Sequence, residues 1–447
     1  MLPVSVERYL NKFGLRDWKI ENSELNKITS AVIIPAICEY YYIRRLLDSL
    51  ADIDKEFFSS TLFVFVVNNP VSSSLEVKEN NLKSIFFLRS IIKKENPAGD
   101  ELVSKIISSG MNLGLADASS SGRELPKKDA GAGLARKIGM DLALTVFDYD
   151  SENKKILISL DADCIVEKNY LSEIINSFNN KNIKAAVINY AHEISGEETD
   201  AIICYEIFLR YYELGLKFAG SPFAFHAIGS TIAFDCECYI KAGGMNKRKA
   251  GEDFYFLEKL AKVTSIERIS GTTVHPSPRS SWRVPFGTGQ RVNRFLSKAQ
   301  NEYLLYNPDS FLILKRWLDV FLLNNYFETD ILIDAAGKID NRLKDFLLDQ
   351  NFKTDWNKIL LDSKTSNQIN RQKINWFDGF MTLKLIHYLR GNGINMINMF
   401  DALDKFLPML EGNYVSEVRK FSEERNNKPV PAKEIQMEYL NLLRKIL

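Results

Sequence analysis

Apolar runs alternate with amphipathic stretches through the N-terminal part of the chain. Runs that are almost continuously apolar predict buried strands at residues 31–37, 61–70, about 102–108, 155–163 and 184–192. Between them, apolar residues spaced by three and four positions predict helices at residues 39–52, about 74–94, 132–147 and about 170–178. Strands that alternate with helices form parallel βαβ units. We therefore expect an α/β, Rossmann-like fold whose mostly parallel sheet has helices on both faces.

Two parts of the chain depart from this alternation. Residues 110–133, GMNLGLADASSSGRELPKKDAGAG, are rich in Gly, Ser, Ala and charge and have no periodicity, so we expect a mobile loop over a site. A disordered insertion without a role is the alternative. Beyond about residue 300 almost every stretch has helical spacing. We therefore expect an α/β domain over residues 1–300 and a helical C-terminal domain or appendage over residues 301–447.

Composition narrows the class of protein. A hydrophobic content of 45% and a charged content of 26% are typical of a soluble globular protein. The net charge of +1, from 58 basic and 57 acidic residues, gives no reason to expect nucleic acid as a partner. The five cysteines are scattered, and Cys236 and Cys238 lack a second pair to complete a zinc site, so we expect packed thiols in a reducing, cytoplasmic setting. No signal-peptide pattern or membrane-length apolar run occurs, and peripheral contact with a membrane stays open.

Polar residues follow the predicted strands, where ligands gather in parallel sheets. Asn68 and Asn69 end one strand, and Asp161 and Asp163 end another. Residues two apart in a strand point to the same side, so these two carboxylates would repel each other without a positive partner. The alternative is a pair of turn or N-cap carboxylates before the next helix.

The order of several segments resembles a known family. AVIIPAICE at residues 31–39, a second strand with a polar end, the LDAD strand end and GGMNKRKAGEDFYFLEKLAK at residues 243–262 resemble glycosyltransferases of the family 2 type with the GT-A fold. The resemblance covers about residues 30–280. It implies transfer of a sugar from a nucleotide-diphosphate sugar to a saccharide or other hydroxyl acceptor. In such enzymes Mg²⁺ or Mn²⁺ neutralises the diphosphate as it leaves.

The resemblance also implies a donor site. Pro35, Ala36 and Glu39 would line the pocket for the base and ribose. Asn68 stands where the family usually has an acidic residue that contacts the base; an amide can also bind a base edge, and turn chemistry before the following proline is the alternative. Arg136, at the start of a helix, would face the donor, with the neighbouring lysine as the other candidate.

The metal and diphosphate ligands follow from the same resemblance. Asp163 would bind the metal, and Asp161 would reach the nucleotide, or the metal through water. His275 stands where many GT-A enzymes have a further metal ligand, with a packed histidine as the alternative. The candidates for contact with the diphosphate are Arg279, Arg283, Arg291 and Arg294, of which Arg283 is preferred.

The acid–base residues would lie at the start of the helix over residues 251–262. In inverting enzymes of this type the Asp of a Glu-Asp pair removes the proton of the acceptor hydroxyl, which assigns Asp253 as general base beside Glu252. Both carboxylates can instead be ordinary charges at a helix N-terminus.

Two other functions stay open. A sugar-phosphate nucleotidyltransferase usually has a Gly-rich loop after its first strand, and IPAICEYYY has no glycine. A non-catalytic GT-A-like binding protein predicts the loss of a carboxylate at the metal or base position, whereas Asp161, Asp163 and Asp253 are all present.

Overall fold

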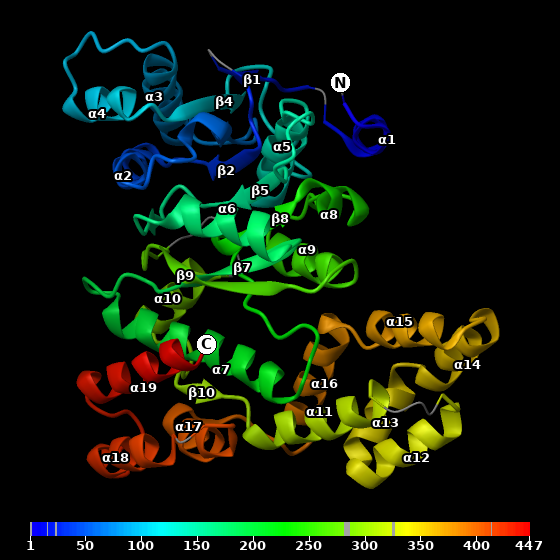
Figure 1. The fold of residues 1–447 in the computed structure, drawn as a ribbon. Helices are drawn as coiled ribbons and strands as arrows, with labels where there is room; N and C mark the ends of the chain where they lie inside the picture. Colours follow the sequence, from blue (N-terminus) through cyan, green and yellow to red (C-terminus); the bar gives the residue numbers. More distant parts are fainter. Residues whose placement is uncertain (1, 16, 23–24, 281–286, 324–326, 413) are drawn as a thin grey trace. The chain divides into compact units, whose positions relative to one another are not determined.

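The computed structural model describes residues 2–15, 17–22, 25–280, 287–323, 327–412 and 414–447 (Figure 1). The chain forms two compact units. Unit 1 comprises residues 1–193 and 227–290, and unit 2 comprises residues 194–226 and 291–447. We expected a single domain boundary at residue 300, whereas the chain passes from one unit to the other after residues 193, 226 and 290. A segment from the middle of the chain, residues 194–226, thus belongs with the C-terminal helices.

A sheet forms the centre of unit 1. Within the described residues it has nine strands in the order β1-β4-β3-β2-β5-β8-β7-β9-β6 (Figure 1). Their bounds are Ile20–Glu21 (β1), Ser30–Ala36 (β2), Thr61–Asn68 (β3), Asn112–Ala118 (β4), Ile156–Ser159 (β5), Ile165–Val166 (β6), Ala185–Tyr190 (β7), Ile232–Asp235 (β8) and Glu267–His275 (β9). The pairs β2–β3, β3–β4, β2–β5 and β7–β9 are parallel, and β8 runs antiparallel to both of its neighbours. The expected mostly parallel α/β sheet is confirmed.

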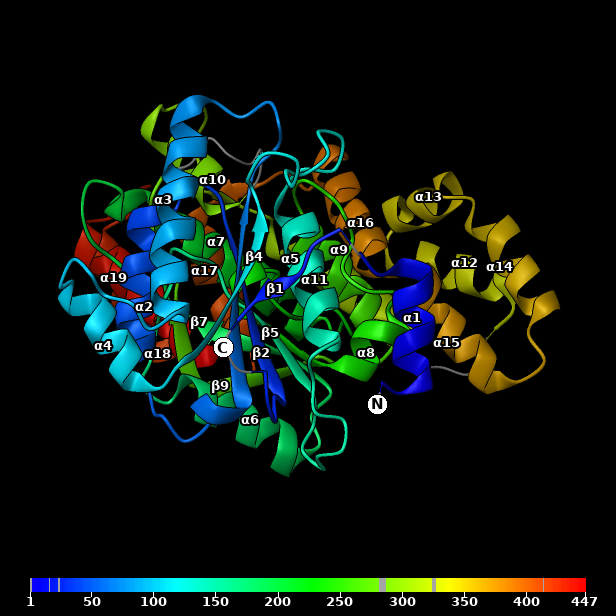
Figure 2. The same ribbon diagram turned by 90° about the horizontal axis from the view of Figure 1, so that it is seen from above.

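Helices cover both faces of this sheet. Seen from above, α2, α3 and α4 lie on one side of the strands, and α5, α8 and α9 lie on the other (Figure 2). The helices of unit 1 are Val4–Phe13 (α1), Tyr40–Ala51 (α2), Leu75–Ile92 (α3), Glu101–Ser109 (α4), Ala132–Leu144 (α5), Tyr170–Lys181 (α6), Cys236–Lys241 (α8) and Glu252–Ala261 (α9). All eight residues of β3 are buried, as two covered faces require.

Two local predictions were wrong. Residues 102–108 belong to helix α4, not to a strand: the Asp100 side chain accepts the N–H groups of Leu102 and Val103 as an N-cap, and Gly110 ends the helix at φ 78°. The apolar residues of this short stretch suit one face of a helix as well as a buried strand. Strand β4 lies inside the stretch that we expected to be a loop. This strand, NLGLADA, contains small residues and was therefore taken for part of a loop. Glycine is required at position 114 because a Cβ atom there would come within 2.8 Å of the Ile20 side chain.

The order of the parallel strands reverses between β2 and β5. From β2 the chain adds β3 and then β4 on one side, and it returns to add β5 on the other side of β2. The carboxyl ends of β2 and β5 are therefore neighbours from which the following segments lead in opposite directions. In open α/β sheets ligands bind at such a topological switch point.

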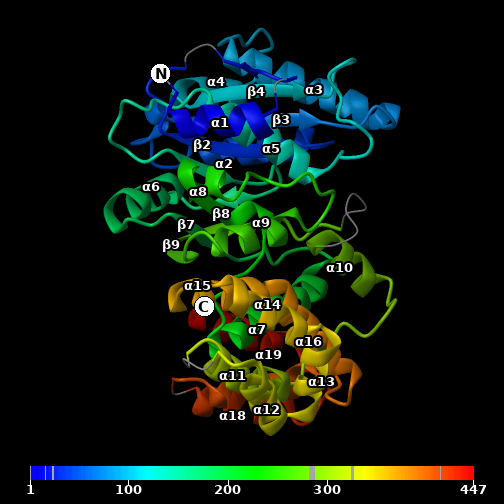
Figure 3. The same ribbon diagram turned by 90° about the vertical axis from the view of Figure 1, so that its right-hand side faces the viewer.

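Unit 2 is helical, as we expected for the C-terminal part of the chain. Its helices are Thr199–Phe218 (α7), Thr288–Leu296 (α10, whose first residues still belong to unit 1), Pro308–Phe321 (α11), Thr329–Ile339 (α12), Asn341–Asp349 (α13), Phe352–Asp362 (α14), Ser366–Trp376 (α15), Gly379–Gly391 (α16), Met399–Phe406 (α17), Val415–Arg425 (α18) and Lys433–Ile446 (α19). A short pair, β10 (Leu304–Leu305) and β11 (Ile397–Asn398), is antiparallel. Figure 3 shows α11, α12, α13, α14 and α16 gathered in one bundle.

Helix α7 is the centre of unit 2. Its buried carboxylate Glu206 accepts a hydrogen bond from Arg210 Nε at 2.8 Å, and it accepts two from Arg444 of α19 at 2.7 and 2.9 Å. This pairing explains why residues 194–226 fold with the C-terminal helices: a carboxylate without exposed surface needs these cations.

Two further observations concern the whole chain. None of the described helices is long and apolar enough to span a bilayer. The five cysteines are free thiols, and Cys236 and Cys238 are buried, as expected for packed side chains.

Helix α1 is anchored to unit 1 by a buried polar network. Tyr9 donates to Asp141 at 2.9 Å and accepts from Lys137 at 2.9 Å, while Tyr239 donates to the same carboxylate at 2.7 Å. Lys137, the alternative donor contact at the start of α5, is thus engaged in this network. Burial lowers the pKa of Lys137 and raises that of Tyr9, so the Tyr9 hydroxyl keeps its proton at neutral pH.

The Tyr9 hydroxyl should hold α1 in place. Tyr9→Phe removes two of its hydrogen bonds, and we expect local opening of α1 to become easier by about 1 kcal/mol, or about fivefold faster amide exchange in residues 4–13. Hydrogen exchange followed by mass spectrometry measures this. Tyr41→Phe is the control, because Tyr41 is 64% exposed. Equal exchange in the two variants would mean that the network does not anchor the helix.

Candidate active site

The carboxylates of the candidate site lie at the switch point between β2 and β5. Glu39 follows β2 and is 5% exposed. After β5 the chain turns through Asp161, Ala162 and Asp163 before β6 begins. Ala162 is buried while both aspartates are partly accessible, so the turn presents the two carboxylates and hides the residue between them. Strand β5 ends at Ser159, so the two aspartates lie in a turn and not in the strand from which their shared direction was predicted.

Arg136 is the first positive partner of this acidic group. It is 3% exposed and extends from α5. Its Nε donates to Ser159 Oγ at 2.9 Å, one terminal nitrogen donates to Asp161 at 2.5 Å, and the other pairs with Glu252. Burial alone would lower the pKa of this guanidinium, but the surrounding carboxylates hold it above its ordinary value. One buried cation therefore joins the end of β5 to the start of α9.

Glycines make room for this connection. A Cβ atom at Gly229 would come within 2.4 Å of the Arg136 guanidinium, and one at Gly133 would come within 2.5 Å of the Arg248 carbonyl oxygen. The guanidinium thus packs on bare backbone, and the segment before α9 touches the first turn of α5. Gly251 adopts φ 68° directly before Glu252, a left-handed conformation that glycine tolerates without a steric penalty. Gly133, which the sequence analysis counted as part of a loop, thus allows two segments to pack closely.

Arg279 is the second positive partner, and it lies in the segment after β9. Its Nε donates to Asp163 Oδ2 at 2.9 Å, Nη2 lies 2.7 Å from the same oxygen, and Nη2 also donates to Glu39. The guanidinium carbon stands 3.9 Å from the centre of the Tyr42 ring. Arg279 thus bridges the segments that follow two neighbouring strands.

Glu252 and Asp253 begin α9, as the sequence predicts. The Glu252 side chain is 7% exposed and is paired with Arg136, whereas Asp253 stays partly accessible. Burial and then the Glu252 charge raise the pKa of Asp253 to about 7, against the opposing effect of Arg136; Asp161 raises it further. A carboxyl group with a pKa near neutrality can accept and return a proton under ordinary conditions.

The remaining donor-side candidates lie near the same edge of the sheet. Pro35 and Ala36 are the last two residues of β2. Asn68 ends β3, is 4% exposed, and donates its amide to the carbonyl oxygens of Ala36 and Val66 at 3.1 Å each. Asn69 joins a separate network with Asn81, which donates to it at 2.8 Å. The amide of Asn68 is therefore used to fasten two strand ends, which is nearer to the structural alternative than to contact with a base.

Both ring nitrogens of His275 contact groups other than the two aspartates. His275 Nδ1 lies 2.9 Å from the Ala191 carbonyl oxygen and Nε2 lies 2.8 Å from Glu167 Oε1, so protein atoms occupy both ring nitrogens. Across the parts of the chain that the structure describes, no group of three or more His, Cys, Asp and Glu side chains is arranged to hold a metal ion. The packed histidine, given above as the alternative, agrees with this geometry.

The other arginine candidates are placed differently. Arg283 lies outside the described residues. Arg291 and Arg294 belong to unit 2 and pair there with Glu302 at 3.2 and 2.8 Å. His226 also belongs to unit 2, where it is 4% exposed and lies 3.4 Å from Glu213. Of the arginines named from the sequence, Arg136 and Arg279 thus contact the aspartates.

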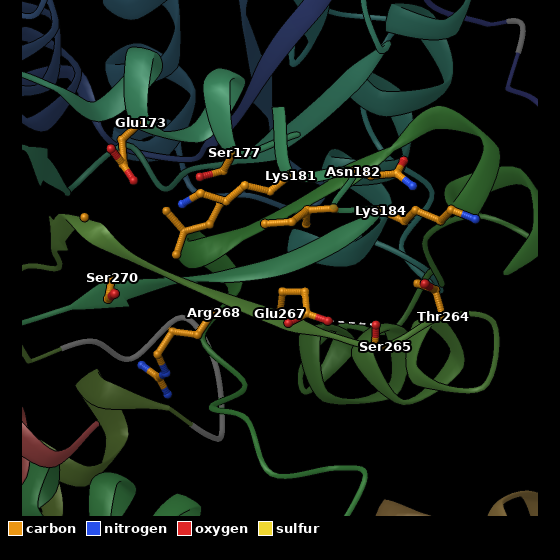
Figure 4. Close-up of a pocket in the computed structure, with 13 residues that line it drawn as sticks. Glu173, Ser177, Lys181, Asn182, Lys184, Thr264, Ser265, Glu267, Arg268 and Ser270 are labelled. Atoms are coloured by element: carbon orange, nitrogen blue, oxygen red, sulfur yellow. Dashed lines mark hydrogen bonds between the residues drawn. The ribbon is translucent and has the colours of Figure 1, made fainter. Parts of the chain in front are cut away.

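A separate pocket of about 570 Å³ lies between α6 and β9 (Figure 4). Lys181 and Lys184 line it near the start of β7, and Glu267 of β9 accepts a hydrogen bond from Ser265 at 2.8 Å. Since β5 and β7 run in the same direction, the amino end of β7 lies at the opposite edge of the sheet from Asp161. None of the candidate site residues lines this pocket.

Three residues that contact the arginines of the candidate site were not predicted from the sequence: Ser159, Gly229 and Tyr42. Ser159 is a single polar residue in an apolar strand, which was a usable signal for a buried hydrogen bond. Gly229 stands alone in its segment and gave no signal, and Tyr42 is one of three consecutive tyrosines. Ser159 and Gly229 contact Arg136, which is 23 and 93 positions away, and Tyr42 stacks on Arg279, which is 237 positions away; periodicity encodes none of these contacts.

Comparison with known proteins adds the following. No protein-family model matches the chain, and no curated protein matches its sequence. Similar solved structures include S. aureus TarS 1–349 in complex with UDP-GlcNAc, at 14% identity, with 94% of this chain and 91% of that chain covered and a TM-score of 0.37. Another is the mannosyltransferase PcManGT from Pyrobaculum calidifontis in complex with GDP-Man and Mn²⁺, at 11% identity, 99% and 91% coverage and a TM-score of 0.37.

A third similar structure is glucosyl-3-phosphoglycerate synthase from Mycobacterium tuberculosis in complex with Mn²⁺, UDP and phosphoglyceric acid, at 13% identity, 62% and 78% coverage and a TM-score of 0.32. TM-scores of 0.32 to 0.37 establish no functional relationship, so the function of this chain rests on its own residues.

Proposed function

We propose that unit 1 is a glycosyltransferase domain that moves a sugar from a metal-bound nucleotide-diphosphate sugar to an acceptor hydroxyl, with inversion and with Asp253 as general base. One observation carries the proposal: a buried arginine, Arg136, joins Asp161 at the switch point of the sheet to the pair Glu252–Asp253. A donor-side carboxylate and a candidate base are thereby held in one connected group. The acceptor hydroxyl would meet Asp253, which is the member of the pair that stays accessible.

The donor side is suited to a cation and a diphosphate. Five carboxyl groups gather around two guanidinium groups: Glu39, Asp161, Asp163, Glu252 and Asp253 around Arg136 and Arg279. Carboxylates are thus in excess, and after burial, which is the larger cause, the charges of Glu252 and Asp161 raise the pKa of Asp253. Mg²⁺ and Mn²⁺ are commonly held by one or two carboxylates together with substrate phosphates, so Asp161 and Asp163 fit this ligand set without a third protein ligand. When bound, such an ion would neutralise the charge that develops on the departing diphosphate.

The acceptor side is suited to proton removal. Asp253 lies in the first turn of α9, and its own carboxylate accepts the N–H of Phe254 at 2.8 Å, which fixes its direction. Glu252 is held by Arg136 and leaves Asp253 as the group that can take a proton. The general-base assignment therefore rests on accessibility, pKa and position together.

A binding experiment tests the donor half of the proposal. Nucleoside diphosphates, beginning with UDP and GDP, are added with and without Mn²⁺, and the thermal midpoint is followed. We expect a metal-dependent rise with one nucleotide, and we expect Asp163→Asn to abolish its dependence on metal. Asp150→Asn is the control, because Asp150 is an exposed residue in the turn before β5. No response to any nucleotide would favour a non-catalytic binding protein, and release of pyrophosphate from a nucleoside triphosphate and a sugar phosphate would identify a nucleotidyltransferase.

The pH dependence of transfer should report Asp253. The base acts when ionised, so kcat/KM should fall as pH drops through about 7, where the carboxyl group becomes protonated. Glu252→Gln removes a neighbouring negative charge that raises this pKa, and the acid limb of the profile should move to lower pH. Glu258→Gln, on the same helix and paired with Lys262, should leave the limb in place. An acid limb that does not move in Glu252→Gln would assign the titration to another group.

A further inference from the structure

Arg279 occupies the place that a cation would take beside Asp163. Its guanidinium uses Nε and Nη2 on one oxygen of Asp163, at 2.9 and 2.7 Å, and Nη2 also reaches Glu39. Burial by itself would lower the pKa of Arg279, but Asp163 and Glu39 hold it above its ordinary value, so the group stays charged. Asp163 is therefore already neutralised by the protein's own side chain.

The same guanidinium is anchored on α2 independently of Asp163. Tyr42, whose ring lies 3.9 Å from the guanidinium carbon, and Glu39 are three residues apart at the start of that helix, so they present one face to Arg279. Stacking on the ring and the ion pair with Glu39 would persist if Arg279 turned away from Asp163. Tyr42 and Glu39 thus hold the Arg279 side chain on α2, while its contact with Asp163 can be exchanged for another anion.

A divalent cation and this guanidinium compete for Asp163. Two positive groups on the same carboxylate would repel each other strongly in a partly buried place. A metal ion that binds alone must displace Arg279 from Asp163 and leave a guanidinium short of negative charge. A diphosphate that arrives with the ion supplies that charge, because guanidinium groups bind phosphate oxygens through two parallel hydrogen bonds.

We infer that Arg279 is an internal cation that shields Asp163 in the free protein and passes to the donor diphosphate when metal and nucleotide bind together. This inference rests on the proposed function and adds a rule to it: metal and nucleotide bind with positive coupling. The coupling is reciprocal, since each ligand raises the affinity for the other by the same factor. The free protein would therefore bind Mn²⁺ weakly by itself.

The test is a pair of titrations on the full chain. Mn²⁺ binding is measured from the loss of the free-ion electron paramagnetic resonance signal, first without nucleotide and then with saturating UDP or GDP, whichever binds. In the wild-type protein we expect about tenfold or more tighter binding of Mn²⁺ with nucleotide present. In Arg279→Gln we expect tighter binding of Mn²⁺ alone, weaker binding of nucleotide, and a coupling factor smaller than in the wild-type protein, with the remainder due to direct binding of the ion by the diphosphate.

A matched variant controls for the loss of a surface arginine. Arg44 pairs with Asp100 at 2.8 Å and stacks on Phe87 at 4.9 Å, which is the same combination of carboxylate and ring outside the site. Arg44→Gln should behave as wild type. Arg279→Lys keeps the positive charge but cannot donate two parallel hydrogen bonds. Without nucleotide, this variant should therefore still bind Mn²⁺ more weakly than Arg279→Gln does.

The outcomes separate this inference from the proposed function. If metal and nucleotide bind but Arg279→Gln leaves the affinity for Mn²⁺ alone unchanged or lower, the inference is overturned while the glycosyltransferase proposal stands. If neither wild type nor variant binds a nucleotide with Mn²⁺, the proposed donor site is wrong and the inference falls with it.

Discussion

Asp253→Asn should lower the rate of sugar transfer by about a thousandfold, within the range usual for the loss of a general base. Asparagine keeps the size of the side chain but takes no proton from an acceptor hydroxyl. Binding of metal and nucleotide should be unchanged, because Asp161 and Asp163 remain. The measurements are kcat for transfer and the affinity for nucleotide with Mn²⁺, compared between the wild-type protein and the variant.

Stability provides the control for this variant. Folding raises the pKa of Asp253 from 3.8 to about 7, so above pH 7 the folded protein carries an ionised group that burial and Glu252 disfavour. Removing that charge should leave the thermal midpoint at pH 8 equal or higher. A rate that falls without a loss of stability separates a catalytic role from a structural one. Transfer that survives in Asp253→Asn would show that another group is the base.

Arg136→Met should destabilise unit 1 by about 3–5 kcal/mol, the usual cost of removing one partner from a buried ion pair. The variant leaves Asp161 and Glu252 without the cation that joins them and leaves Ser159 without its donor. Chemical denaturation measures the loss, and binding of metal and nucleotide should weaken because Asp161 is no longer held. Arg136→Lys keeps the charge but lacks the several N–H donors of a guanidinium. Its free energy of unfolding should lie between those of the wild-type protein and Arg136→Met.

Arg45→Met is the matched control for Arg136. Arg45 is a half-exposed arginine of α2 that lies 3.4 Å from Glu193. Exposed pairs of this kind are worth up to about 1 kcal/mol. If Arg136→Met costs no more than Arg45→Met, the connection between Asp161 and α9 does not carry the stability that its burial implies.

Periodicity was enough for most elements and failed where a stretch was short or its residues small. Helix α5 and strand β3 were found because each has a long, consistent pattern. Residues 101–109 were misassigned because their apolar positions fit two periods, and the N-cap at Asp100 was the signal that distinguished them. Strand β4 was overlooked because alternating small residues resemble a loop, although pairing with β3 and β1 completes it.

The carboxylates of the candidate site could be predicted from the sequence, but their cationic partners could not. Asp161, Asp163, Glu252 and Asp253 could be named from the sequence, because each stands at the end of a recognisable strand or the start of a recognisable helix. Which cation meets which carboxylate could not be named. Arg136 and Arg279 are separated from their partners by between 23 and 240 positions, and only the packed strands and loops bring them together.

By itself the amino-acid sequence determined the α/β class, the helical C-terminal part and the set of carboxylates, since these depend on local periodicity and on residue type at strand ends. The tertiary structure decided three other matters: the inclusion of residues 194–226 in unit 2, the contacts of His275 with Ala191 and Glu167, and the pairing of Asp161 with Arg136 and of Asp163 with Arg279. The physical reason is that burial and Coulomb energy depend on distances between residues far apart in the chain. Those distances exist only after the strand order is set.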